Sequence, residues 1–152
     1  MLGKRFRIMI CALLIPFIGS GCDQSQKTSQ THFDSNDLCD FHQGACQLML
    51  DENIVELSIT PADAPSEKPL IFQLKISDTL RITESVIEGR DMFMGIIPLN
   101  WQKRGENLYQ SSVIYGSCAS GYMVWRLKIT FINDKGLTKQ AWFDFLADNN
   151  SD

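Results

Sequence analysis

The stretch YMVWRLKITF, residues 122–131, decides the fold class of this chain. Apolar side chains take every second position, and most positions between them are polar or charged. The apolar set is Met123, Trp125, Leu127, Ile129 and Phe131. Because successive side chains of a strand point to opposite sides of a sheet, this period of two predicts a strand with one face in a hydrophobic core.

The same pattern repeats on both sides of this stretch. Further extended segments are expected at 46–50, 55–60, 70–77, 80–88, 92–97, 107–116 and 140–147. Polar turns separate them, among them QKRGE and NDKG, and no segment has the period of a helix. Many short strands at regular intervals are typical of sandwiches. The sequence therefore predicts an all-β protein, an immunoglobulin-like antiparallel β-sandwich of seven or eight strands after a signal peptide and flexible tether.

The N-terminus has the layout of a secretory signal. A basic start precedes an apolar run, Ile8–Ile18, which is shorter than the roughly 20 residues that a membrane span requires. Small residues and Cys22 follow, so the segment resembles a bacterial lipoprotein signal in which Cys22 is lipidated. Gly19 stands where that signal usually has an aliphatic residue, and the alternative is an ordinary cleaved signal. Asp23 resembles the residue that retains lipoproteins in the inner membrane.

These features divide the chain into a signal peptide (1–21), a flexible tether (22–37), a β-sandwich domain (38–148) and a disordered tail (149–152). The expected location is the periplasmic side of the bacterial inner membrane, with the lipid on Cys22 as the anchor. Loss of residues 1–21 leaves 11 basic against 18 acidic residues, a net charge of about −7. An acidic surface repels phosphate backbones, so nucleic acid is not an expected partner.

Three cysteines remain in the expected domain. Cys39 and Cys46 lie close in sequence, and a disulfide between them is the simplest pairing in an oxidising compartment. A bridge from Cys46 to Cys118 is the alternative. Either pairing leaves an odd cysteine, which is a thiol or a metal ligand.

A cluster of sulfur side chains is the main candidate for chemistry. Met92 and Met94 are one residue apart before Gly95, which lets another chain or a ligand approach closely. On a strand both side chains would share a face. Cys118, Met123 and His42 complete a possible Cu(I) site, because thioether and thiolate are the soft donors that Cu(I) selects. The competing interpretation is core packing, since methionine fills irregular gaps.

Four short segments carry a resemblance to known families. DMFMG, LYQSSVIYGSC, GYMVWRLKITF and WFDF, within residues 54–146, resemble small periplasmic sandwich proteins of the FixH/YtkA-like and CopC-like kind. The resemblance implies copper handling or assembly of respiratory oxidases at the inner membrane, with Met92 and Met94 as the donor pair. Those families often place a histidine beside the methionines, and this sequence has none there.

Motifs of common enzymes are missing from the sequence. It has no C-x-x-C, no C-x-x-C-H and no H-E-x-x-H, so we expect no enzyme. The alternative to a Cu(I)-binding or metallochaperone-like module is a non-enzymatic adaptor or envelope assembly lipoprotein that binds another envelope protein. Sheet edges and exposed aromatic side chains would then matter, with Trp101, Tyr109 and Trp142 as candidates.

Overall fold

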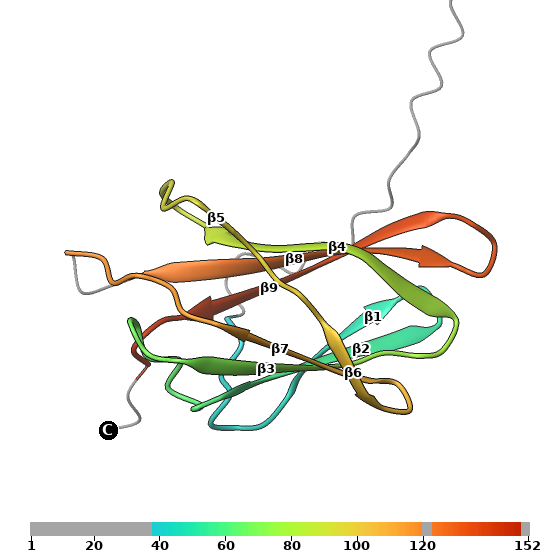
Figure 1. The fold of residues 1–152 in the computed structure, drawn as a ribbon, viewed down its shortest axis with the longest axis horizontal. Helices are drawn as coiled ribbons and strands as arrows, with labels where there is room; N and C mark the ends of the chain where they lie inside the picture. Colours follow the sequence, from blue (N-terminus) through green and yellow to red (C-terminus); the bar gives the residue numbers. More distant parts are fainter. Residues whose placement is uncertain (1–37, 120–122, 150–152) are drawn as a thin grey trace, which may run out of the picture.

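Two antiparallel sheets pack face to face in the computed structural model, which describes residues 38–119 and 123–149 (Figure 1). One sheet has the order β1-β2-β3-β7-β6 and the other β5-β4-β8-β9. The strands are β1 (Cys46–Leu50), β2 (Asn53–Thr60), β3 (Leu70–Lys75), β4 (Leu80–Gly89), β5 (Ile96–Pro98), β6 (Gln102–Gly105), β7 (Leu108–Val113), β8 (Val124–Asn133) and β9 (Thr138–Leu146). The prediction of an all-β antiparallel β-sandwich is confirmed.

Several expectations fall on residues that lie outside the described part of the chain. These are the signal peptide, the lipidated Cys22, the tether up to residue 37 and most of the C-terminal tail. Within residues 38–119 and 123–149, no helix is long and apolar enough to cross a membrane.

The hydrophobic core is formed by the segments in which apolar and polar residues alternate most clearly. The five alternate side chains from Met123 to Phe131 are all buried, and so are the inward residues of β2 and β3. In β8 these positions lie between β4 and β9, so both neighbours complete its hydrogen bonds while its inner face fills the space between the sheets. Trp125 is fully buried, as predicted, and its ring stacks on Tyr115 with 4.7 Å between centroids.

Two segments differ from the expectation. The strand predicted at 92–97 is reduced to β5, and Met92 lies in the connection before it. Gly95 has a φ of +85°, a left-handed conformation that breaks an extended run. The turn predicted at 102–106 contains β6, whose residues are all exposed. A polar edge strand has no apolar alternation to reveal it, and the described residues therefore hold nine strands rather than seven or eight.

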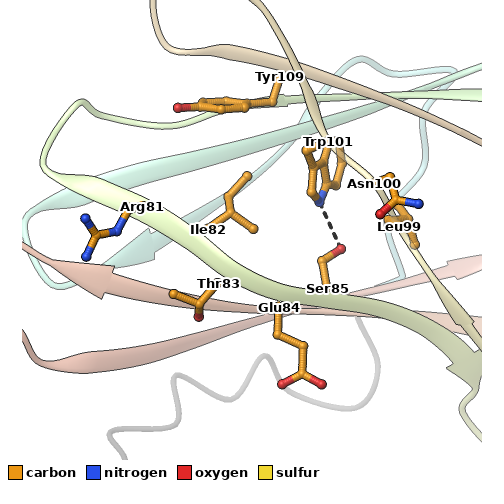
Figure 2. Close-up of a pocket in the computed structure, with 9 residues that line it drawn as sticks. All are labelled: Arg81, Ile82, Thr83, Glu84, Ser85, Leu99, Asn100, Trp101 and Tyr109. Carbon is orange, nitrogen blue, oxygen red and sulfur yellow. Dashed lines mark hydrogen bonds between the residues drawn. The ribbon is translucent and has the colours of Figure 1, made fainter.

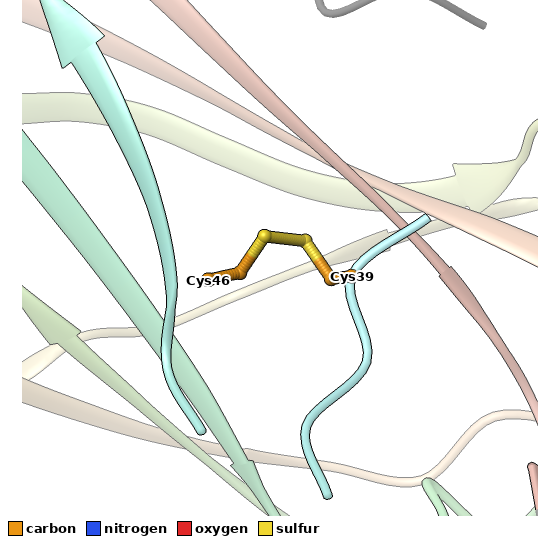
Figure 3. The surroundings of a disulfide bond; sticks show 2 residues. All are labelled: Cys39 and Cys46. Carbon is orange, nitrogen blue, oxygen red and sulfur yellow. A yellow bond between two sulfur atoms is a disulfide. The ribbon is translucent and has the colours of Figure 1, made fainter. Parts of the chain in front are cut away.

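A disulfide between Cys39 and Cys46 closes one side of the sandwich (Figure 3). The backbone N–H of Cys39 donates to the carbonyl of Asp144 (2.7 Å), and Cys39 bridges Phe145 of β9. Cys46 begins β1 in the other sheet. The bond therefore ties the edge of one sheet to the edge of the other, and the predicted pairing is confirmed while Cys118 stays a thiol.

Candidate functional site

Two connections project from the same end of the sandwich (Figure 1, left). One joins β4 to β5 and carries Met92; the other joins β7 to β8 and carries Cys118. The β4–β5 connection is fixed at its start, where the backbone N–H of Arg90 donates to the carbonyl of Val124 (2.9 Å). Sequence-distant sulfur side chains can therefore meet at this end of the fold.

The β7–β8 connection is held by the loop between β2 and β3. The hydroxyl of Tyr115 donates to the carbonyl of Ala64 (2.5 Å), and the carbonyl of Tyr115 accepts from the N–H of Glu67 (2.9 Å). The hydroxyl of Ser117 then donates to the Glu67 carboxylate (2.6 Å). Burial raises the pKa of the Tyr115 phenol, so this hydroxyl keeps its proton and its bond at neutral pH. Cys118 follows directly after this anchored segment.

Cys118 and Met92 form the centre of the site. The Sγ atom of Cys118 lies 3.7 Å from the Sδ atom of Met92, although the two residues are 26 positions apart. Met92 is 46% exposed, whereas Cys118 is half-buried. The geometry suits a weak S–H···S hydrogen bond in the thiol form. It also leaves two soft donor atoms side by side near solvent.

Gly89 lets the backbone of Met92 lie close to the end of β4. A Cβ atom at this position would lie 2.2 Å from the carbonyl oxygen of Met92 and 2.4 Å from the methyl carbon of Met123. Both distances are far inside van der Waals contact, so only glycine fits here. Met123 is 5% exposed and packs beneath the Met92 backbone as part of the core. As a core residue it is far less accessible than Met92, which is 46% exposed.

The other two sequence candidates occupy different environments. Met94 is half-buried in the β4–β5 connection and packs against the core, so it does not share an exposed strand face with Met92. The ring of His42 is exposed, and its Nε2 lies 2.8 Å from the carbonyl oxygen of Asn149. Within the described residues no contact joins this ring to either sulfur atom of the pair.

Acidic side chains close to the sulfur pair are already engaged. Arg90 donates two hydrogen bonds of 2.9 Å to Asp91, and these bonds hold the pKa of Asp91 below its usual value. Glu88 pairs with Lys128 on the outer face of β4 and β8 at 2.5 Å. Hard cations such as Mg²⁺ need oxygen donors. Both carboxylates are balanced by cations, whereas the thioether and the thiol of the sulfur pair are soft donors.

The outer face of the four-stranded sheet is a network of charges. Arg126 donates two hydrogen bonds of 2.7 Å to Asp144, and these bonds raise the pKa of the guanidinium. The same guanidinium lies 5.0 Å from the ring centre of Trp142, and Lys128 lies 5.9 Å from it. These cation–π contacts give the ring of Trp142 a structural role on the outer face of the sheet.

A pocket of about 290 Å³ lies between β4 and the segment that carries Trp101 and Tyr109 (Figure 2). The disulfide lies by the β1 and β9 edges, away from this pocket. The first half of β4 forms one wall, and Trp101 and Tyr109 form the other. The indole N–H of Trp101 donates to the hydroxyl of Ser85 (2.9 Å), and Ser85 is buried. This bond fixes the tryptophan ring between the two sheets.

No family model matches the sequence, and comparison with curated proteins and with solved structures finds no similar chain. The resemblance to FixH/YtkA-like and CopC-like proteins therefore stays a prediction. Among residues 38–119 and 123–149, no group of three or more His, Cys, Asp or Glu side chains is arranged to hold a metal ion. A metal at the sulfur pair would have to rely on thioether donors as well.

Among the described residues, the close approach expected at Gly95 occurs at Gly89 instead, and approach of a ligand to Gly95 stays a prediction. A Cβ atom added at Gly95 would meet no described atom within 4 Å, and the role of this glycine is the left-handed turn. Gly89 is the crowded position, and its place at the end of the β4 pattern was the available signal. The sequence did not reveal that Ser85 is buried and accepts a hydrogen bond from Trp101. A serine within a strand pattern resembles any other polar position.

Proposed function

We propose that this protein is a lipid-anchored lipoprotein of the bacterial envelope whose sandwich binds Cu(I) through Cys118 and Met92. The anchor is Cys22, and the location is the periplasmic side of the inner membrane. The role is copper handling, of the kind that supplies or protects copper during assembly of respiratory oxidases. The protein acts by binding and not as an enzyme.

One observation carries the metal proposal: the 3.7 Å between the Sγ atom of Cys118 and the Sδ atom of Met92. Two sulfur atoms bound to one ion at about 2.3 Å, with a tetrahedral angle between the bonds, lie about 3.8 Å apart. The pair could thus accept an ion with little movement. Thiolate and thioether together favour Cu(I) over harder ions.

The position of the pair supports exchange of the ion rather than permanent storage. Met92 is half exposed, and the neighbouring Phe93 is the most exposed large apolar side chain among those of the described surface. Both belong to the short connection between β4 and β5, which a partner can approach from outside. Two protein donors leave room for a ligand from that partner.

Titration of the purified full chain with Cu(I), against a competing chelator, tests the proposal. Ascorbate keeps copper as Cu(I) while leaving the Cys39–Cys46 disulfide intact. We expect Cys118→Ser to abolish competitive binding, because a hydroxyl is a poor donor for a soft ion. Met92→Leu keeps the volume and removes the sulfur, so it should weaken binding without unfolding the chain.

A matched control is Met49→Leu. Met49 is 54% exposed and lies on β1 in the other sheet, so it tests whether any exposed thioether contributes. Its affinity for Cu(I) should equal that of the wild type. A Cys118→Ser, Met92→Leu double variant that competes as well as the wild type would show that the sulfur contact is packing only.

A further inference from the structure

The first half of β4 is an uncovered sheet edge. β5 pairs with β4 only from Val86 to Glu88, and the N–H of Leu99 adds one bond to the carbonyl of Ser85 (3.0 Å). Beyond that point the chain leaves for β6 in the other sheet. Among the described residues, β8 is therefore the only strand paired with Leu80–Glu84, and it lies on the opposite side.

A pocket lies along this same edge. Its walls are the β4 residues from Arg81 to Ser85 on one side and Trp101 and Tyr109 on the other (Figure 2). At about 290 Å³ it lies just below the roughly 300–1,000 Å³ of sites for whole small molecules. One large apolar side chain fits that volume better than a complete ligand.

Charges mark the two ends of the uncovered edge. Arg81 and Glu84 are both exposed, and neither forms an ion pair within the described residues. A segment lying along the edge would meet a positive charge near one end and a negative charge near the other. This arrangement favours a partner with one acidic and one basic residue on either side of its apolar side chain.

We propose that an extended peptide segment of a partner protein adds to β4 as a strand along Leu80–Glu84, in line with β5. Its backbone bonds to the uncovered edge, and one apolar side chain enters the pocket between Trp101 and Tyr109. Strand addition of this kind takes affinity from main-chain hydrogen bonds and specificity from pockets for alternate side chains. The site is separate from the sulfur pair and does not depend on copper.

A second copy of this chain fits the edge less well than a peptide. β4 has a register shift between Ile82 and Glu84, and such bulges hinder edge-to-edge pairing of two sheets. The uncovered stretch is also short, because β5 occupies the remainder of the strand. A flexible peptide can follow a short, bent edge, whereas a rigid sheet cannot.

Selection from a phage-displayed library of random peptides on the full chain tests the proposal. We expect enrichment of peptides in which a large apolar residue has an acidic residue on one side and a basic residue on the other. The peptide that binds best is then synthesised as the probe. Trp101→Ala should weaken its binding by about ten-fold or more, as loss of a buried aromatic anchor does. The matched control Trp142→Ala, a tryptophan on the outer face of β9, should leave the affinity unchanged.

Two further measurements keep the test independent of folding defects. Arg81→Glu combined with Glu84→Lys changes only exposed side chains, and it should weaken a peptide selected on the wild type. N-methylation of the probe on the residues facing β4 should abolish binding, whereas methylation on the alternate residues should not. Absence of enrichment relative to the Trp101→Ala variant, equal effects of both methylation patterns, or dimerisation through this edge would each overturn the proposal.

Discussion

The start of β8 and the connection from Arg90 to Gly95 meet at one end of the sandwich, where a methionine precedes the strand and another lies in the connection. Met123, directly before β8, is 5% exposed, whereas Met92 in the connection is 46% exposed. The backbone carbonyl of Met92 and the methyl group of Met123 both lie close to Gly89. The same side chain is core filling in one segment and an accessible donor in the other, which shows that residue type alone does not separate the two roles.

Strand pairing accounts for the difference. Met123 precedes β8, and its carbonyl accepts from the N–H of Ala147 just after β9 (2.9 Å), so its side chain continues the buried face of β8. Within the described part of the chain, Met92 and its neighbours up to Gly95 pair with no strand. Their backbone forms a turn with Gly95 in a left-handed conformation, and the side chains of Met92 and Phe93 are exposed. Substitutions in the two segments should therefore differ in what they change.

Trp125→Ala should have the largest effect. The side chain is fully buried and stacks on Tyr115, so its loss should lower the free energy of unfolding by about 3–5 kcal/mol. Urea denaturation with an unchanged m-value measures this loss. Trp125→Phe serves as the control: it keeps a ring on Tyr115 and removes an indole N–H that has no hydrogen-bond partner among the described residues. A loss as large as that of alanine would contradict the stacking argument.

Gly89→Ala should come next, because this glycine joins the two segments. The added methyl would lie 2.2 Å from the carbonyl oxygen of Met92, and a backbone atom cannot turn aside as a side chain can. We expect about 1–3 kcal/mol of destabilisation from overpacking. The substitution should also displace Met92 and weaken Cu(I) binding. Stability and chelator competition equal to those of the wild type would show that the approach at Gly89 is not tight.

Gly95→Ala should cost less, and for a different reason. Its φ of +85° is unfavourable for alanine, by about 1–2 kcal/mol, but no described atom would clash with the new methyl. Lower entropy of the unfolded chain offsets part of that cost, so we expect about 1 kcal/mol or less. Thermal unfolding of the two alanine variants side by side tests the contrast. A larger loss for Gly95→Ala than for Gly89→Ala would reverse the assignment of the crowded glycine.

The sequence predicted most of the fold because alternation is a local signal. β1 was predicted with the bounds that the structure has, and the inward residues of β2, β3 and β8 are buried as expected. β6 and the short β5 were not predicted correctly, although each pairs with a strand next to it in the sequence. The residues of β6 are all exposed and show no apolar alternation, and the turn at Gly95 shortens β5. An all-polar strand such as β6 becomes visible only when its neighbour β7 is placed beside it.

The candidate site was predicted less completely than the fold. Residue chemistry pointed to Met92 and Cys118, but nothing local to either residue fixes the 3.7 Å between their sulfur atoms. The two connections that carry these residues are placed by the close backbone approach at Gly89 and by the hydrogen bond from Tyr115 to Ala64. His42 was included for its chemistry alone, and the fold places its ring against the Asn149 carbonyl instead.

The same substitution made in both segments gives the smallest change in stability and the sharpest comparison. Met92→Leu alters an exposed side chain, so its stability should stay within about 0.5 kcal/mol of the wild type while Cu(I) binding weakens. Met123→Leu conserves volume in the core and should cost about 1 kcal/mol or less, with Cu(I) binding retained. Chelator competition and urea denaturation on both variants separate ligation from packing, because only ligation depends on the sulfur atom. If Met123→Leu lost copper and Met92→Leu kept it, the donor would be the buried methionine, and the exposed one would merely cover it.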